Sequence, residues 1–95
     1  MDKLTMKGLK GLGKRQREII DYMRKGFRIV ETHDNYTNEH WIELSDESDT
    51  IMDVPKSTVE SFVNRGIVKL FTFSPSLQID QTIIELKRNN HEQHH

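Results

Sequence analysis

The sequence contains no cysteine, which excludes disulfide bonds, thiol catalysis and zinc sites with cysteine ligands. No apolar run approaches the roughly 18 residues that a membrane-spanning helix needs. The first thirteen residues, MDKLTMKGLKGLG, lack the apolar core of a secretory signal peptide. We therefore expect a cytoplasmic protein that does not insert into a membrane.

Apolar residues are also scarce, because only 34% of the 95 residues are hydrophobic whereas 31% are charged. A chain of this length forms one domain with a modest core. Three of the five glycines lie within residues 1–13, and glycine costs a helix about 1 kcal/mol at each position. We expect a flexible basic arm over residues 1–13, a folded domain over residues 14–86 and a disordered polar tail over residues 87–95.

The net charge of −1 conceals a segregation of charge along the chain. Residues 1–30 carry nine basic and three acidic side chains, whereas residues 31–54 carry eight acidic side chains and no lysine or arginine. Residues 55–95 are almost balanced, with five basic and four acidic side chains. Such asymmetry indicates a polyanionic or acidic partner on one side of the molecule, unless the two halves neutralise each other or are simply solvated.

Hydrophobic spacing predicts two helices. Residues 14–25 place apolar side chains at helical intervals, and residues 55–65 repeat the pattern after a proline suited to the first turn. Ser57 and Glu60 have the spacing of a capping box. Each helix is followed by a glycine and then an apolar residue, which predicts left-handed helix ends at Gly26 and Gly66.

Alternating side chains predict a hairpin after each helix. The first hairpin covers residues 27–44 around a turn at 35–38, and the second covers residues 67–86 around Ser-Pro-Ser. Residues 45–53 between the first hairpin and the second helix read as an acidic loop. The preferred register of the first hairpin puts Trp41 beside Thr32 on one face and makes three pairs on the other, namely Ile29 with Leu44, Glu31 with Ile42 and His33 with His40.

The segment VPKSTVESFVNRGIV, residues 54–68, resembles the recognition helix of a winged-helix domain. The match consists of a valine, a capping serine and a Thr-Val pair at the helix start, followed by an Arg-Gly-apolar step into the next hairpin. The resemblance implies an α+β, winged-helix-like fold of atypical small form over residues 14–86, in the order helix–hairpin–helix–hairpin. It also implies a transcriptional regulator that binds duplex DNA, with this helix in the major groove.

Two groups of residues would then contact DNA. The resemblance assigns the outward side of the second helix, which carries Lys56, Ser57, Ser61, Asn64 and Arg65. A basic surface suited to the phosphate backbone or a minor groove is formed by Lys7, Lys10, Lys14, Arg15 and Arg17. The alternative for the arm is a tail that only solubilises the chain.

A second interpretation is a protein-interaction module, such as those that phages and mobile elements direct at host machinery. The second hairpin is apolar on both faces, so the face that does not cover the helices meets the first hairpin, a second copy of the chain or a partner. The predicted interface residues are Trp41, Phe71 and Phe73, with the acidic segment 31–54 as an alternative surface. A homodimer belongs to this interpretation.

Catalytic chemistry is not predicted. His33 and His40 are expected to be cross-strand neighbours near a hairpin tip and could bind a metal together with a carboxylate, but two histidines on a surface hairpin are more often ordinary strand residues. We therefore expect no enzyme activity, no catalytic residue, no metal site and no cofactor.

Overall fold

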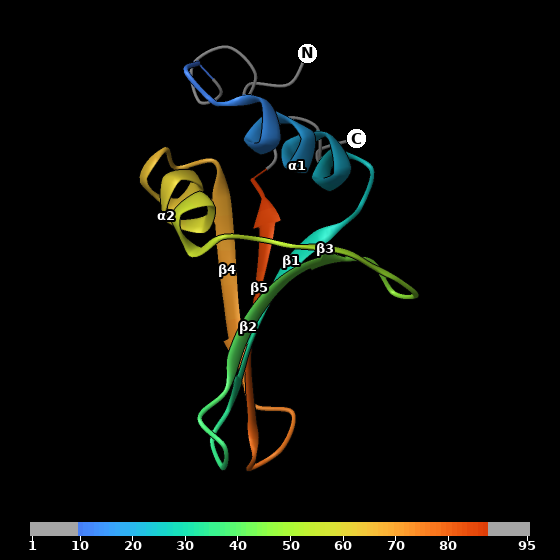
Figure 1. Ribbon diagram of the computed structural model, residues 1–95, viewed down its shortest axis with the longest axis vertical. Helices are drawn as coiled ribbons and strands as arrows, with labels where there is room; N and C mark the ends of the chain where they lie inside the picture. Colours follow the sequence, from blue (N-terminus) through green and yellow to red (C-terminus); the bar gives the residue numbers. More distant parts are fainter. Residues whose placement is uncertain (1–9, 88–95) are drawn as a thin grey trace, which may run out of the picture.

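The computed structural model of the protein describes residues 10–87. These residues form two helices and five strands (Figure 1), in the order α1 (Lys14–Arg24), β1 (Arg28–Asp34), β2 (His40–Ser45), β3 (Thr50–Asp53), α2 (Lys56–Asn64), β4 (Val68–Phe73) and β5 (Ile79–Leu86). The predicted α+β class is confirmed. The predicted order is wrong at one point, because Thr50–Asp53 forms a strand and not part of a loop.

All five strands form one antiparallel sheet in the order β3-β2-β1-β5-β4. β1 lies at the centre because it pairs with β2 on one side and with β5 on the other. The predicted register of the first hairpin is confirmed, since Ile29 opposes Leu44 and Trp41 opposes Thr32. The second predicted hairpin is confirmed as well, with β4 antiparallel to β5.

The helices pack at one end of the sheet, where β1 begins and β5 ends. Figure 1 shows α2 beside one face of the sheet and α1 across its end. Their apolar stripes meet alternate strand residues in a single core, which contains Ile19, Ile20, Met23, Val59, Phe62, Ile29, Ile42, Leu44, Ile84 and Leu86. Because successive strand residues point to opposite faces, the residues between them lie on the face away from α2. We call this side the open face.

Both helices end as their glycines predict. Gly26 and Gly66 have φ angles of 108° and 70°, in the left-handed region that favours glycine. The amides of Gly66 and Ile67 donate to the carbonyls of Val63 and Phe62, and the residues after α1 repeat this pattern. Paired bonds of this kind define a Schellman motif, which turns the chain sharply from each helix into a strand.

The fold is not a winged helix. The second hairpin, which would be the wing of a winged-helix domain, does not project separately, because β5 pairs along six residues with β1 and joins both hairpins in one sheet. The predicted recognition helix packs on this sheet through Thr58, Val59 and Phe62, with β1, β2 and β3 preceding it in the chain. The resemblance was carried by fifteen consecutive residues, and that local sequence does not determine how distant strands pair.

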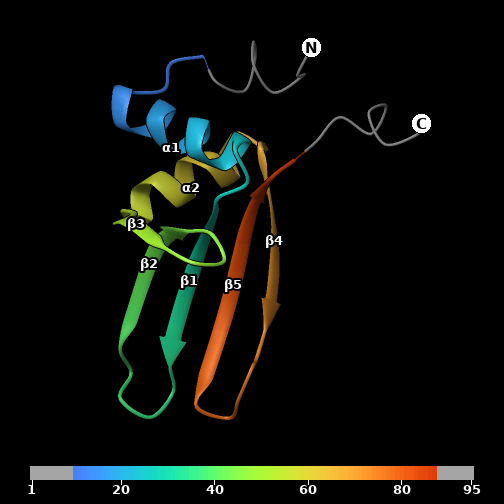
Figure 2. The same ribbon diagram turned by 90° about the vertical axis from the view of Figure 1, so that its right-hand side faces the viewer.

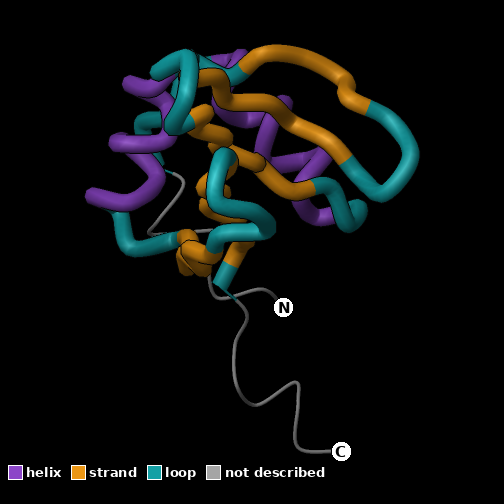
Figure 3. The backbone as a smooth tube through the Cα atoms, turned by 90° about the horizontal axis from the view of Figure 1, so that it is seen from below, coloured by secondary structure: helices purple, strands orange, loops and turns teal. Residues whose placement is uncertain are grey.

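Viewed onto the open face, the strands extend well beyond the helices (Figure 2). From below, as in Figure 3, the strands form a curved sheet and do not lie flat. Within residues 10–87, neither helix is long and apolar enough to cross a membrane.

Candidate protein-binding face

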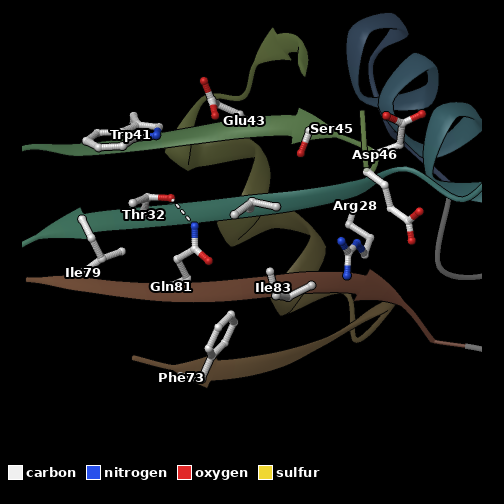
Figure 4. A pocket seen from close by; sticks show the side chains of 12 residues that line it. Arg28, Thr32, Trp41, Glu43, Ser45, Asp46, Phe73, Ile79, Gln81 and Ile83 are labelled. Atoms are coloured by element: carbon white, nitrogen blue, oxygen red, sulfur yellow. Dashed lines mark hydrogen bonds between the residues drawn. The ribbon is translucent and has the colours of Figure 1, made fainter. Parts of the chain in front are cut away.

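One row of side chains crosses the open face from β2 to β4. Trp41 opposes Thr32, Thr32 opposes Gln81, and Gln81 opposes Phe73. Residues that oppose each other in a sheet point to the same side, so the four side chains lie in sequence across four strands. Figure 4 shows the two aromatic rings at the ends of this row and the polar pair between them.

A second row runs parallel to the first, one step closer to the helices. It places Phe71 beside Ile83, Ile83 beside Val30, and Val30 beside Glu43. Together with Ile79, the residues of these rows other than Phe71 line an open hollow of about 680 Å³ on the sheet. The apolar floor of this hollow, interrupted by Thr32 and Gln81, therefore has side chains from every strand between β2 and the outer strand β4.

The three predicted interface residues lie together on this face. Trp41 is 39% exposed, Phe71 51% and Phe73 46%. Trp41 and Phe73 are separated by 32 residues in the chain, and the β1–β5 pairing brings them onto one surface. Small proteins rarely leave a contiguous apolar patch exposed, so this clustering indicates a contact surface.

A hydrogen bond joins the two polar side chains in the middle of the hollow. Gln81 donates from Nε2 to Oγ1 of Thr32 over 3.3 Å, and Thr32 is buried. A partner therefore does not have to supply hydrogen bonds to the Thr32 hydroxyl when it displaces water from the floor. The pair separates two apolar regions of the hollow, around Trp41 on one side and around Phe73 on the other.

Acidic side chains border the hollow at the end near the helices. Glu43, Asp46 and Glu47 line it together with one basic residue, Arg28 (Figure 4). Three carboxylates against one guanidinium give this border a charge of −2. A cationic group is therefore attracted to the border, whereas a phosphate is repelled.

Asp46 also fixes the loop that carries the acidic border. Its Oδ1 atom accepts hydrogen bonds from the backbone amides of Ser48 and Asp49, over 2.9 and 2.8 Å. The Asp49 and Ser48 amides hold the pKa of the Asp46 carboxyl below its usual value, despite a small opposing effect of desolvation. The loop therefore presents an ionised carboxylate at neutral pH.

The predicted histidine pair lies on the opposite face from the hollow, near the far end of the sheet. His40 bonds through Nε2 to Glu31 Oε2 over 2.6 Å, and His33 bonds to Asn38 Oδ1 over 2.8 Å. The two imidazole rings are 6.3 Å apart, edge to face. Within residues 10–87, no group of three histidine or acidic residues has the geometry of a metal site. Each histidine thus bonds to a side chain of the same hairpin, His40 to Glu31 and His33 to Asn38.

The residues predicted to contact DNA lie on α1, on α2 and in the segment before α1. Lys7 lies outside the described residues. Arg65 donates from Nε to Ser61 Oγ and from Nη1 to the Lys10 carbonyl, so it joins α2 to the segment before α1. Arg15 lies on α1 and contacts Glu18 and the sulfur of Met52.

The other predicted DNA contacts are exposed on the two helices, where acidic side chains accompany them. Lys14 and Arg17 are exposed on α1, and Lys56, Ser57 and Asn64 on α2. Lys56 and Asn64 border a hollow of about 430 Å³ between α2 and the sheet. Glu31 and Glu60 border the same hollow, which reduces its attraction for phosphate.

Two features of the open face were missed in the sequence. Ile79 joins the hollow only because β5 pairs with β1, a contact between residues about fifty positions apart, whereas Arg28 opposes Ser45 of β2. The available signal was the alternation of residues 79, 81 and 83 along β5, which predicts a common face but does not identify the neighbouring strand.

Comparison with known proteins gives no relative for this chain: no protein-family model, curated protein or solved structure matches it. Any functional proposal therefore depends on the geometry of the described residues.

Proposed function

We propose that the protein is a binding module that holds a segment of a partner protein on the open face of its sheet. The observation that carries this proposal is the grouping of Trp41, Phe71 and Phe73 on one face of the sheet, where Trp41 and Phe73 line the hollow and Phe71 lies beside Ile83 on its floor. Exposed aromatic side chains contribute large contact areas at little cost in conformational entropy, and they dominate the energetics of many protein interfaces.

The charge of the border favours a partner segment with basic residues. An exposed sheet with aromatic side chains can also stack unpaired bases, as single-strand-binding domains do. Such domains combine stacking with a positively charged groove, whereas Glu43, Asp46 and Glu47 make this border negative. In a peptide that alternates apolar residues with lysine, the apolar side chains can pack on the floor of the hollow while the lysines pair with the acidic border.

The proposal is tested with a fluorescein-labelled peptide that alternates leucine and lysine, titrated with the protein and followed by anisotropy. Phe73→Ser should weaken binding at least tenfold, because it removes one end of the aromatic row. Tyr36→Ser is the matched control, since Tyr36 is exposed in the turn between β1 and β2 and does not line the hollow.

The same titration separates protein binding from nucleic-acid binding. A peptide in which glutamate replaces lysine should bind much more weakly, and labelled oligodeoxythymidine and a labelled DNA duplex should not bind through this face. The proposal would be overturned if either nucleic acid bound tightly, if Phe73→Ser abolished that binding, and if the basic peptide did not bind.

A further inference from the structure

The two edges of the sheet differ in how they are protected. β3 is four residues long, its pairing with β2 shifts at Leu44 and Ser45, and it ends at Asp53. Short length, a bulge and edge charges are the usual devices against pairing with another strand. β4 has six residues, continuous register with β5, no proline and one charged side chain, Lys69. In Figure 2, β4 forms the outer edge of the sheet.

The backbone of β4 presents hydrogen-bonding groups on its outer side. The Lys87 amide donates to the Ile67 carbonyl, and this pair continues the β4–β5 register. Antiparallel strands alternate between hydrogen-bonded and non-hydrogen-bonded pairs, so Lys69, Phe71 and Phe73 turn their backbone groups toward β5. Leu70 and Thr72 consequently direct theirs away from the sheet.

Apolar side chains flank this edge on both faces. Leu70 is 48% exposed and opposes Ile84, which places it on the side of the helices. Phe71 and Phe73 lie on the open face and are about half exposed. A strand added at this edge would therefore bury apolar surface above and below the new backbone bonds.

We infer that β4 pairs with β4 of a second copy of the chain, antiparallel and centred on Phe71. Leu70 then opposes Thr72 of the second copy, and each pair exchanges both backbone hydrogen bonds. The two Phe71 side chains meet as a non-hydrogen-bonded pair, the closer kind of cross-strand contact. The two five-stranded sheets become one continuous sheet.

Backbone register, exposed apolar side chains and the absence of like-charge contact together favour a second copy as the occupant. With the two-fold axis at Phe71, Lys69 opposes Phe73 of the second copy, so the two lysines are kept apart. Lys69 already lies with its Nζ atom 5.5 Å from the centre of the Phe71 ring, an arrangement in which a cation is stabilised by an aromatic face. The strand is thus complementary to its own reversed sequence in backbone and apolar groups, and its single charged side chain meets no like charge.

This inference does not depend on the proposed partner of the open face. Leu70 and Thr72 lie on the other face of the sheet, so substitutions there test the edge without altering the aromatic row. In the dimer the two open faces would lie side by side and meet at the two Phe71 side chains. A partner that carries two copies of the binding segment could then contact both faces at once.

Sedimentation equilibrium of the full chain over a wide range of concentration tests the dimer. We expect a mass approaching twice 11.2 kDa at high concentration and the monomer mass on dilution. Thr72→Pro removes the outward amide, a change that edge strands tolerate, and should leave the protein monomeric. Thr72→Ala is the matched control: it removes the hydroxyl that bonds to Thr82 but keeps the amide, so it should still form the dimer.

Amide exchange on the unaltered chain gives a second readout that does not require a variant to fold. Protection at Leu70 and Thr72 should increase with protein concentration, and Leu70→Lys should raise the dissociation constant at least tenfold. A monomer mass at every concentration would overturn the inference. A dimer that forms through the open face would also overturn it. Such a dimer would be lost in Trp41→Ser, and the amides of Leu70 and Thr72 would exchange at the same rate at every protein concentration.

Discussion

Individual carboxylates organise the turns that shape the sheet. Asp34, buried at the end of β1, accepts hydrogen bonds from the Tyr36 and Thr37 amides and from the Gln78 side chain. The Thr37 amide contributes most to lowering the pKa of Asp34; desolvation opposes it, and the hydrogen bonds from Gln78 and Tyr36 lower the pKa further, so that the net shift is downward. Asp34 therefore joins the turn after β1 to the start of β5.

These contacts predict a loss of stability in acid. A carboxyl whose pKa is lower in the folded protein binds fewer protons there, so it stabilises the fold above its unfolded pKa of about 3.9. This contribution disappears as the pH falls through the folded pKa. Urea unfolding between about pH 7 and pH 2 should show the loss below about pH 4.

Asp34→Asn should reduce the stability at neutral pH and flatten this acid dependence, because the amide does not ionise. If Asp34→Asn kept the full slope of the unaltered chain below about pH 4, the assignment to Asp34 would be wrong.

Neighbouring residues on α2 should differ sharply in their contribution to stability. Phe62 is fully buried in the core, whereas Val63 is 41% exposed. Phe62→Ala should lower the free energy of unfolding by about 3–5 kcal/mol through loss of burial and formation of a cavity. Val63→Ala should change it by less than about 1 kcal/mol. Denaturant melts of both variants measure the difference, and equal losses would contradict the packing described for α2.

At the scale of elements, the glycines after the helices control the direction of the chain. Gly66 has a φ angle of 70° and no atom near the position of an added Cβ, so the cost of a side chain is conformational alone. Gly66→Ala should lower stability by about 1–2 kcal/mol. Gly66→Asn should cost less, since asparagine adopts left-handed conformations more readily. Thermal unfolding of the two variants tests this order, which the reverse result would contradict.

Local patterns predicted the first hairpin because its partners are close in the chain. Alternation and a turn of four residues were sufficient to place Trp41 beside Thr32 and away from Ile29. The same approach missed β3, whose four residues include only Ile51 and Met52 as apolar members and follow a run of acids. Its strand character depends on hydrogen bonds to β2, which the local sequence does not encode.

The other differences from the sequence prediction have one local cause and one long-range cause. The capping box expected at Ser57 and Glu60 does not form, since Pro55 is the N-cap residue and no side chain caps the helix. The sequence predicted Phe71 and Phe73 as interface residues, because the second hairpin is apolar on both sides. The open face is one continuous surface only because β1 pairs with β5 and joins the two hairpins. The same pairing means that the second hairpin does not stand apart as a wing.

For the molecule as a whole, the acidic middle segment and the apolar sheet combine at one border. Glu43 comes from β2 and Asp46 from the loop after it, and both line the hollow. Electrostatic attraction of this kind mainly affects association rates and is screened by salt.

Glu43→Gln should therefore slow association of the leucine–lysine peptide and reduce its dependence on salt. Glu60→Gln is the matched control, because Glu60 is an exposed residue of α2 that does not line this hollow. Stopped-flow anisotropy at two salt concentrations measures both effects. Equal association rates for Glu43→Gln and the unaltered chain would show that the border does not attract the peptide.

Trp41 allows the central claim to be measured directly, because it is the single tryptophan of the chain and lies on the open face. Its fluorescence emission is recorded while the leucine–lysine peptide, without a label, is added. Binding on the open face should shift the emission to shorter wavelengths as the indole leaves water, and Phe73→Ser should abolish the shift. A peptide that binds with no change in Trp41 emission would contradict the account.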